Sequence, residues 1–351
     1  LPWMFKFLWA PLIDRYGTRK QWLIGLQSAL TVVSIGISQF SLQNMVALAV
    51  GIFLLNLFSA TQDIAVDGLA VDFSQGEEKP LGPINTLQGV GYKLGMLAGG
   101  GLLLWLLDDW QVQFQVMAGI YILTAAAVAF IHFKERDHDN PDWGTLFASA
   151  KSILRGQNIL ALLIIVGTYK LGESVADTMF KPFVYDLGYS PADIGRILGT
   201  WGLIASLLGS SLGGVFVLRA GVRRALIWSA AFRVLPMFAQ WGLTLFTPEE
   251  SHLVATTLAE HFFSGLLTTA MFAFMMSLTD ARLGASHFTL LASVEVCGKL
   301  PASWLSGLVA ERVGYGILFL LAALLCVAYS LALPPLLNRL RYTRVAAPET
   351  P

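Results

Sequence analysis

The sequence predicts an all-α protein that crosses a lipid bilayer many times, and three observations support this fold class. The chain of 351 residues is 55% hydrophobic and 13% charged, whereas ordinary soluble domains are about 25% charged. Its apolar residues form repeated runs of about 20 residues, the length that a helix needs to cross the hydrocarbon core. These runs lack the alternation of a β-strand, and backbone within lipid must satisfy its own hydrogen bonds. The lipid bilayer is therefore the first partner that we expect.

We predict eleven membrane-spanning helices, separated by short polar segments. Their limits are 1–13, 22–41, 44–72, 85–107, 111–133, 158–185, 192–217, 225–246, 253–278, 288–310 and 315–337. Lysine and arginine concentrate in alternate loops, and the opposite set of loops holds only Arg312. Because cytoplasmic loops carry the excess of these residues, we expect the segment 14–20, the loop 133–157 and the C-terminus to be cytoplasmic.

The charge balance, the cysteines and the absence of catalytic motifs exclude other classes. The 23 Lys+Arg equal the 23 Asp+Glu, so the chain has no basic field for nucleic acid. Cys297 and Cys326 lie in apolar runs, which is typical of buried apolar side chains and not of a disulfide framework or metal site. No GxxxxGK[ST], HExxH or GxSxG motif occurs. We expect no cofactor, no metal and no enzymatic activity.

Two cytoplasmic loops indicate an internal repeat. Asp14-Arg-Tyr-Gly-Thr-Arg-Lys20 matches Leu218-Arg-Ala-Gly-Val-Arg-Arg224 in four positions of seven when Lys20 is counted with Arg224, at an offset of 204 residues. The distance from each loop to the end of the last predicted span of its half is 119 residues, from 14 to 133 and from 218 to 337, but one helix fewer precedes the first loop. We therefore expect two six-helix halves, with the first helix missing from this chain. The predicted parts are an N-terminal half at 1–133 (helices two to six), a cytoplasmic linker at 134–157, a C-terminal half at 158–337 (helices seven to twelve) and a cytoplasmic tail at 338–351.

The first loop resembles the signature loop of the major facilitator superfamily. The matching residues are Asp14, Arg15, Gly17, Arg19 and Lys20. Other runs are similar to the group that contains muropeptide permeases and acetyl-coenzyme A transporters: 1–14, 60–67, 92–95 and 169–173. The runs 81–86, 209–214, 260–269 and 285–292 are similar to the subfamily of major facilitator superfamily domain-containing protein 3. The resemblance implies the major facilitator fold, whose first, fourth, seventh and tenth helices line a central cavity.

The signature loop is a candidate gate, although a simple positively charged turn is the plainer alternative. We expect the Asp14 carboxylate to bind across the cytoplasmic ends of the two halves and to hold an outward-facing state. Leu218 stands at the equivalent place in the second loop. The gate should therefore be one-sided.

Ionisable residues inside predicted spans are candidates for substrate or proton sites, because each one is costly within lipid. Asp63 and Asp67 lie four residues apart on one helix face, and their mutual repulsion favours one of them holding a proton near neutral pH. Lys93, which follows Tyr92 on the next helix, could instead neutralise this pair in a structural cluster.

Four charges form a strip on the predicted span 158–185. Lys170, Glu173, Asp177 and Lys181 are spaced three and four residues apart, which places them on one helix face. The strip either contacts cargo or forms a structural ladder, in which Lys170 pairs with Glu173 and Asp177 with Lys181. In either case it should face the bundle interior or a watery cavity.

Later spans carry five further candidates. Glu260 and His261 lie on the predicted tenth helix, and His261 could equally be a satisfied core residue. Glu295 and Lys299 are four residues apart and are expected to pair with each other. Arg233 has no acidic residue within a turn, so it could serve an anionic substrate or the scaffold.

Together these features predict a secondary transporter that works by alternating access around a site near the midplane. We expect a symporter that couples protons to an organic anion, with acetyl-coenzyme A favoured and a muropeptide-like sugar as the alternative. The rivals from other classes are a membrane-embedded acyltransferase, which would need a nucleophile or His/Asp pair beside a cytosolic pocket, and a non-transporting scaffold, in which all membrane charges would pair internally.

Overall fold

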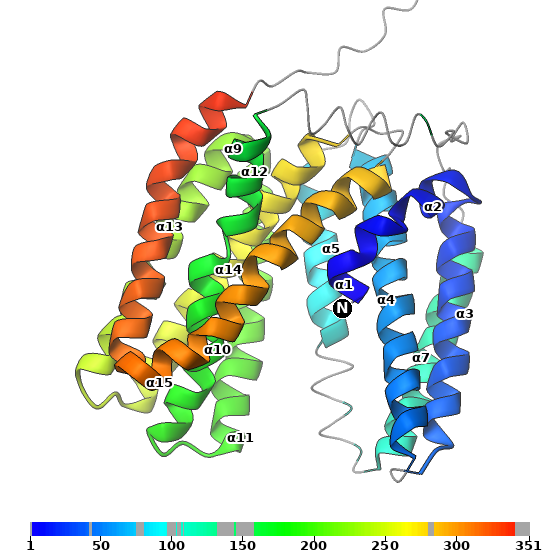
Figure 1. Cartoon of the computed structure of the whole chain (residues 1–351), viewed down its shortest axis with the longest axis horizontal. Coiled ribbons are helices and arrows are strands. Elements are labelled where there is room, and N and C mark those ends of the chain that lie inside the picture. The colour runs from blue at the N-terminus through cyan, green and yellow to red at the C-terminus, as the bar shows by residue number, and fades with distance from the viewer. Residues whose placement is uncertain are drawn as a thin grey trace, which may run out of the picture.

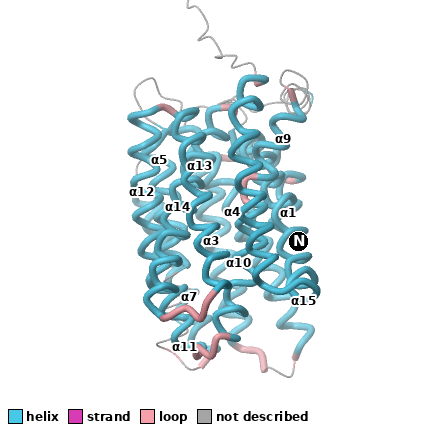
Figure 2. Tube along the Cα trace, turned by 90° about the vertical axis from the view of Figure 1, so that its left-hand side faces the viewer, coloured by secondary structure: helices cyan, strands magenta, loops and turns pink. Residues whose placement is uncertain are grey.

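The computed structural model describes residues 2–41, 44–74, 81–96, 103, 107, 109–131, 144, 158–279 and 284–340. Across these ranges the chain forms a bundle of helices that run nearly side by side (Figures 1 and 2). The predicted linker 134–157, apart from Gly144, lies outside the described residues, as does the predicted tail beyond 340.

The N-terminal group of helices comprises α1 to α7. Its elements are α1 (Pro2–Phe5), the 3-10 helix η1 (Lys6–Leu8), α2 (Ala10–Arg15), α3 (Arg19–Ser38), α4 (Met45–Ser74), α5 (Leu81–Met96) and α7 (Trp110–Phe130). The first predicted span is therefore not one continuous helix. Pro2 and Pro11 each stand at the start of a short helix, where a missing backbone N–H costs little.

The C-terminal group comprises α9 to α15. Its elements are α9 (Ile159–Thr168), α10 (Leu171–Asp186), α11 (Pro191–Ile194), the π-helix η3 (Gly195–Trp201), α12 (Gly202–Ala220), α13 (Val222–Gly242), the 3-10 helix η4 (Leu243–Leu245), α14 (Glu250–Ser277) and α15 (Gly284–Arg339). Two predicted spans are interrupted: 158–185 breaks between α9 and α10, and 192–217 contains η3. α15 changes direction at Gly314, whose φ of 78° is left-handed, so the last two predicted spans form its two limbs.

Seven described segments are long and apolar enough to cross a membrane, and two of them join successive elements: α9 with α10, and α11 with η3 and α12. The predicted count of eleven stays a prediction, because short elements such as α1 and α2 fall below that length, and part of the predicted span 85–107 lies outside the described residues. The buried core is apolar, with its largest cluster between α9, α13, α14 and α15. Cys326 is buried as expected, but Cys297 is exposed.

The two groups meet along two seams. In the first, α15 contacts α1, η1, α2 and α4; in the second, α5 contacts α12 and α14. Figure 1 shows the blue and cyan helices on one side of these seams and the green to red helices on the other. Glycine allows close packing in the C-terminal group, where a Cβ added at Gly298 of α15 would lie 1.8 Å from the Gly167 carbonyl oxygen of α9.

Candidate transport site

A buried cluster in the N-terminal group joins three elements through one lysine. Lys6 of η1 forms ion pairs with Asp63 and with Asp67, the latter at 3.4 Å between Nζ and Oδ2. Gln88 of α5 donates a hydrogen bond of 2.5 Å to the other oxygen of Asp67. Lys6 and Asp67 are almost wholly buried, and Asp63 is partly exposed. The cluster places one ammonium against two carboxylates.

Lys93, which the sequence offers as the alternative partner of this pair, forms no ion pair with it in the described part of the chain. Lys6 takes that place, because η1 packs against α4. The sequence held a signal for Lys6, since a lysine inside an apolar span needs an acidic partner or water, but it gave no indication of which carboxylate lay nearby.

A second cluster, in the C-terminal group, forms around Arg233 of α13. Its guanidinium forms ion pairs with Glu260 of α14 and, at 3.3 Å, with Glu173 of α10, and it also donates to the Glu260 backbone carbonyl. His261 contacts the other oxygen of Glu260, and Ser264 donates a hydrogen bond of 2.8 Å to Glu173. Arg233 is 2% exposed. These contacts tie α10, α13 and α14 together, which agrees with the scaffold alternative for Arg233.

The predicted ladder on the seventh span does not form among the described residues. Glu173 pairs with Arg233, and Lys170 pairs with Glu295 of α15 at 3.5 Å. Asp177 and Lys181 have no ion pair within the described part of the chain, and both are exposed. Lys170 lies before the first turn of α10, and partners on neighbouring helices take both Lys170 and Glu173.

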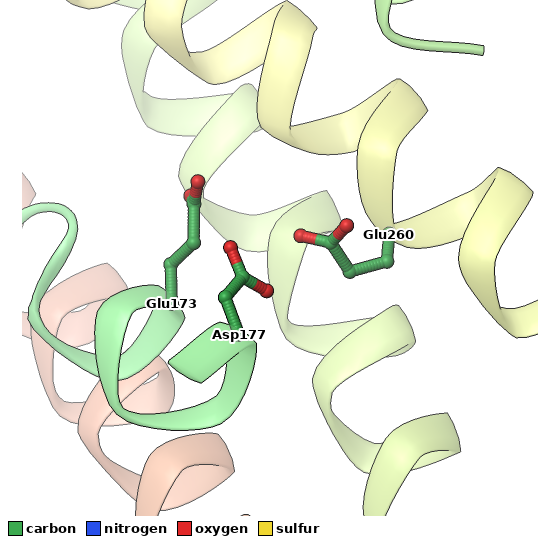
Figure 3. Close-up of side chains that lie close together, drawn as sticks. All are labelled: Glu173, Asp177 and Glu260. Carbon is green, nitrogen blue, oxygen red and sulfur yellow. The ribbon is translucent and has the colours of Figure 1, made fainter. Parts of the chain in front are cut away.

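Three carboxylates converge beside Arg233. Oxygen atoms of Glu173, Asp177 and Glu260 lie within 4.8 Å of one another, and Figure 3 shows Glu173 and Asp177 rising from α10 toward Glu260 on α14. Such a set of oxygen ligands suits a hard cation. However, Arg233 and His261 already contact two of the three, so we assign no metal to them.

The break between α9 and α10 lies beside a further ion-pair group. Lys170 stands at the break, and its ammonium and that of Lys299 both contact the same oxygen of Glu295, at 3.5 and 3.3 Å. The predicted pair of Glu295 and Lys299 is therefore present, and Lys170 joins it. Glu295 is buried, whereas Lys170 and Lys299 are partly exposed.

Lys93 and Tyr92 lie on α5, the helix that meets the C-terminal group at α12 and α14. Thr86 donates a hydrogen bond of 3.4 Å to the Ser210 carbonyl of α12, and Gly89 faces the same serine. Lys93 lies one turn beyond Gly89 and two turns beyond Thr86, hence on the same helix face. Tyr92 is exposed, and Lys93 is partly buried.

The signature loop spans the first seam. Asp14 is buried and accepts hydrogen bonds from the backbone N–H of Ser286, at 2.8 Å, and from its hydroxyl, at the start of α15. Arg19 holds the same carboxylate at 2.5 Å and lies 3.7 Å from Asp72 of α4. Asp14 therefore links the N-terminal group to the C-terminal group.

The remaining loop residues shape the turn. Gly17 adopts a left-handed φ of 69°. Lys20 donates to the carbonyl oxygens of Ala129 and Ile131 at the end of α7, at 2.8 and 2.9 Å. Arg15 lies over the Tyr16 ring, 5.5 Å from its centroid.

A bundle of long apolar helices with buried charge clusters on both sides of a seam defines a multi-pass membrane transport protein. The chain belongs to the major facilitator superfamily, whose family model matches residues 1–172. It is 30% identical to the anhydromuropeptide permease of Escherichia coli strain K12 over 364 residues, covering 98% of this chain and 72% of the permease. It is 31% identical to an uncharacterised protein of Haemophilus influenzae, over 90% of this chain and 79% of that protein.

Solved structures show the same fold at low identity. The chain resembles the xylose symporter XylE with a TM-score of 0.73 at 9% identity, covering 94% of this chain and 82% of XylE. It resembles the outward conformation of FucP with a TM-score of 0.71 at 14% identity, covering 95% of this chain and 88% of FucP. The major facilitator fold predicted from the sequence is confirmed, as is a transporter rather than an enzyme.

The finer resemblances drawn from the sequence have a mixed outcome. Similarity to muropeptide permeases is supported by the Escherichia coli relative. Similarity to acetyl-coenzyme A transporters and to the subfamily of major facilitator superfamily domain-containing protein 3 stays a prediction, as do the membrane orientation and the functional roles of the candidate residues.

Proposed function

We propose that this protein is a secondary active permease for an anhydromuropeptide-like substrate, a sugar that carries a short peptide. The observation that carries this proposal is the 30% identity to the Escherichia coli anhydromuropeptide permease along 98% of this chain. The partly exposed ionisable groups between the two helix groups support a charged and hydrogen-bonding cargo. Acetyl-coenzyme A, favoured by the sequence analysis, enters the test as the competing cargo.

The mechanism that we propose is alternating access between an N-terminal half at 1–133 and a C-terminal half at 158–337. The linker 134–157 would join them on the cytoplasmic side. Asp14 would close the cytoplasmic seam in the outward-facing state by its bonds to Ser286. Rupture of these bonds would accompany opening to the cytoplasm.

We propose proton coupling at Asp63 and Asp67. Lys6 balances one of these two carboxylates, and a second buried negative charge favours proton uptake. Asp63 is partly exposed, which gives the proton a route to water. The described contacts therefore support a cluster that holds or releases one proton as the halves move.

Uptake into proteoliposomes containing the full chain tests the proposed substrate. We expect accumulation of radiolabelled anhydromuropeptide under an inward proton gradient, and loss of accumulation when the gradient is collapsed. Labelled acetyl-coenzyme A serves as the parallel cargo, and protein-free liposomes as the control. Accumulation of acetyl-coenzyme A without anhydromuropeptide would overturn the proposed substrate.

A further inference from the structure

Two aromatic side chains accompany the buried cluster of the N-terminal group, one from α1 and one from α5. We propose that Trp3, Asp63 and Tyr92, here called the sugar subsite, bind the sugar ring of the cargo, and that Lys6 positions the Asp63 carboxylate for it. This inference rests on the proposed transport function and adds to it the place and the chemistry by which the sugar part is recognised.

The first step of the argument places Trp3 beside Asp63. The Lys6 ammonium lies 5.7 Å from the centroid of the Trp3 ring, and the same ammonium forms the ion pair with Asp63. Lys6 is buried, whereas Trp3 and Asp63 each keep part of their surface exposed. One buried cation therefore holds an indole ring and a partly exposed carboxylate next to each other.

The second step places Tyr92 at the height of Asp63 in the bundle. Helices α4 and α5 follow each other along the chain and run in opposite directions (Figure 1). The hydrogen bond from Gln88 of α5 to Asp67 of α4 fixes their register. Tyr92 lies one turn further along α5, and Asp63 lies one turn back along α4, so the two stand at the same level. Tyr92 is 66% exposed. Asp63 thus has one aromatic residue next to it and a second at its height.

The third step is the position of these elements between the two helix groups. Both α1 and η1 contact α4 of their own group and α15 of the C-terminal group, and α5 contacts α12 and α14. The sugar subsite therefore lies on N-terminal elements that border both seams. Alternating access at such a border would open a cargo site to each side of the membrane in turn.

A pyranose ring suits these groups in shape and in polarity. Its C–H faces are apolar and pack flat against an aromatic ring, which offers a large rigid surface. Asp63 binds Lys6 through Oδ2, and within the described part of the chain no donor bonds to its Oδ1. A sugar hydroxyl that donates to this ionised carboxylate would make one of the stronger kinds of hydrogen bond. Aromatic walls with a few polar groups are typical of sites for small molecules.

Equilibrium binding to the purified full chain in detergent tests the subsite without a proton gradient. The probes are the intact anhydromuropeptide, its sugar part released from the peptide, the free peptide and N-acetylglucosamine, each measured by titration calorimetry. We expect Trp3→Leu to weaken binding of the released sugar by about three- to tenfold. Trp3→Phe keeps an aromatic face and should retain most of the affinity.

Matched variants separate sugar binding from a structural role of the indole. Tyr92→Leu should weaken binding of the released sugar as Trp3→Leu does, and neither should change the affinity for the free peptide. Trp228→Leu removes an exposed tryptophan of α13 and should leave every affinity unchanged. If Trp3 serves only to cover Lys6, then Trp3→Leu lowers the unfolding temperature and leaves the sugar affinity of the folded protein as it was.

A photoreactive derivative of the released sugar gives a second test that needs no substitution. Its crosslinks in the parent protein should map to residues 2–8 and to the parts of α4 and α5 around Asp63 and Tyr92. An excess of the unmodified sugar should suppress them. Crosslinks confined to the C-terminal group would overturn the subsite, even if Trp3→Leu failed to fold.

The possible results keep this inference apart from the proposed function. Unchanged sugar affinity in Trp3→Leu and Tyr92→Leu, with normal anhydromuropeptide uptake by the parent protein, would overturn the sugar subsite and leave the permease proposal intact. Binding of N-acetylglucosamine that depends on Trp3, in a protein that takes up no anhydromuropeptide, would support the subsite and reject the proposed cargo. A parent protein that binds neither the released sugar nor N-acetylglucosamine would overturn the subsite whatever its cargo.

Discussion

The two buried clusters neutralise carboxylates inside the helix bundle in different ways. In the N-terminal group, Lys6 holds two carboxylates that lie on one helix, and Asp63 stays partly exposed. In the C-terminal group, Arg233 ties three helices together and is almost wholly buried. Lysine is a compact point charge on a flexible stem, whereas arginine binds through a planar fork of fixed geometry. The first arrangement suits a site that changes its protonation, and the second suits a fixed frame.

The largest effect on stability should come from the cluster around Arg233, which we call the fixed frame. Arg233→Met leaves Glu173 and Glu260 buried without their cation, and removing one partner of a buried ion pair costs about 3 to 5 kcal/mol. We expect a large fall in the thermal unfolding temperature in detergent. Arg224→Gln, at an exposed position of the same helix, should cost almost nothing. Equal stability of the two variants would contradict the frame role.

The packing of glycines also differs between the two helix groups, and substitution by alanine tests this difference. Gly298→Ala would drive a methyl group into the Gly167 carbonyl, and forced overpacking typically costs about 1 to 3 kcal/mol. Gly95→Ala of α5 meets nothing within 4 Å and serves as the matched control. Unfolding in detergent should separate the two variants. If the Gly298→Ala protein were as stable as the Gly95→Ala protein, the close contact between Gly298 and Gly167 would be contradicted.

Substitution of Asp14 should change the populations of the outward-facing and inward-facing conformations more than it changes the stability to unfolding. Asp14→Asn weakens the bonds to Ser286 and Arg19, and a lost hydrogen bond to a charged group costs about 1.5 to 3 kcal/mol. Thiol labelling of engineered cysteines at the predicted cytoplasmic side should therefore become faster. Arg224→Gln, in the repeated loop, is the control. Labelling rates that match the parent protein would reject Asp14 as the gate.

We expect the smallest effect on stability from a substitution in the cluster of Lys6, Asp63 and Asp67. Its effect on transport should be specific. Asp67→Asn should abolish proton-driven accumulation of the cargo, because the cluster then lacks the second carboxylate that binds the proton. Lys6 keeps Asp63 as its partner, so the unfolding temperature should fall little. Uptake measured across a pH series provides the test. An unchanged pH profile would exclude coupling at this cluster.

The helices were predictable because each carries its own signal. The predicted span 44–72 became α4 at Met45–Ser74, since a long apolar run between polar residues has few other solutions in a bilayer. The pair of Glu295 and Lys299 was equally local, one turn apart on one helix. Features that depend on a single helix could therefore be predicted from the sequence.

The partners across helices were not predictable in the same way. Nothing near Arg233 in the sequence points to Glu173, sixty residues earlier, because the packing of α10 and α14 against α13 decides the contact. Likewise, Lys6 reaches Asp63 through the folded bundle, and the break after Thr168 interrupts an apolar run that reads as continuous. Long-range pairing depends on helix rotation, which a single chain's hydropathy does not encode.

The two similar loops share the backbone conformation of one glycine and differ at the position of Asp14. Gly17 and Gly221 both have left-handed backbones, with φ of 69° and 80°, and any side chain there would be strained whatever its chemistry. Asp14 has its buried partners, whereas Leu218 at the matching position is exposed. The two loops thus place the same demand on the backbone of the turn, whereas only the first loop holds an acid that bonds to the other helix group.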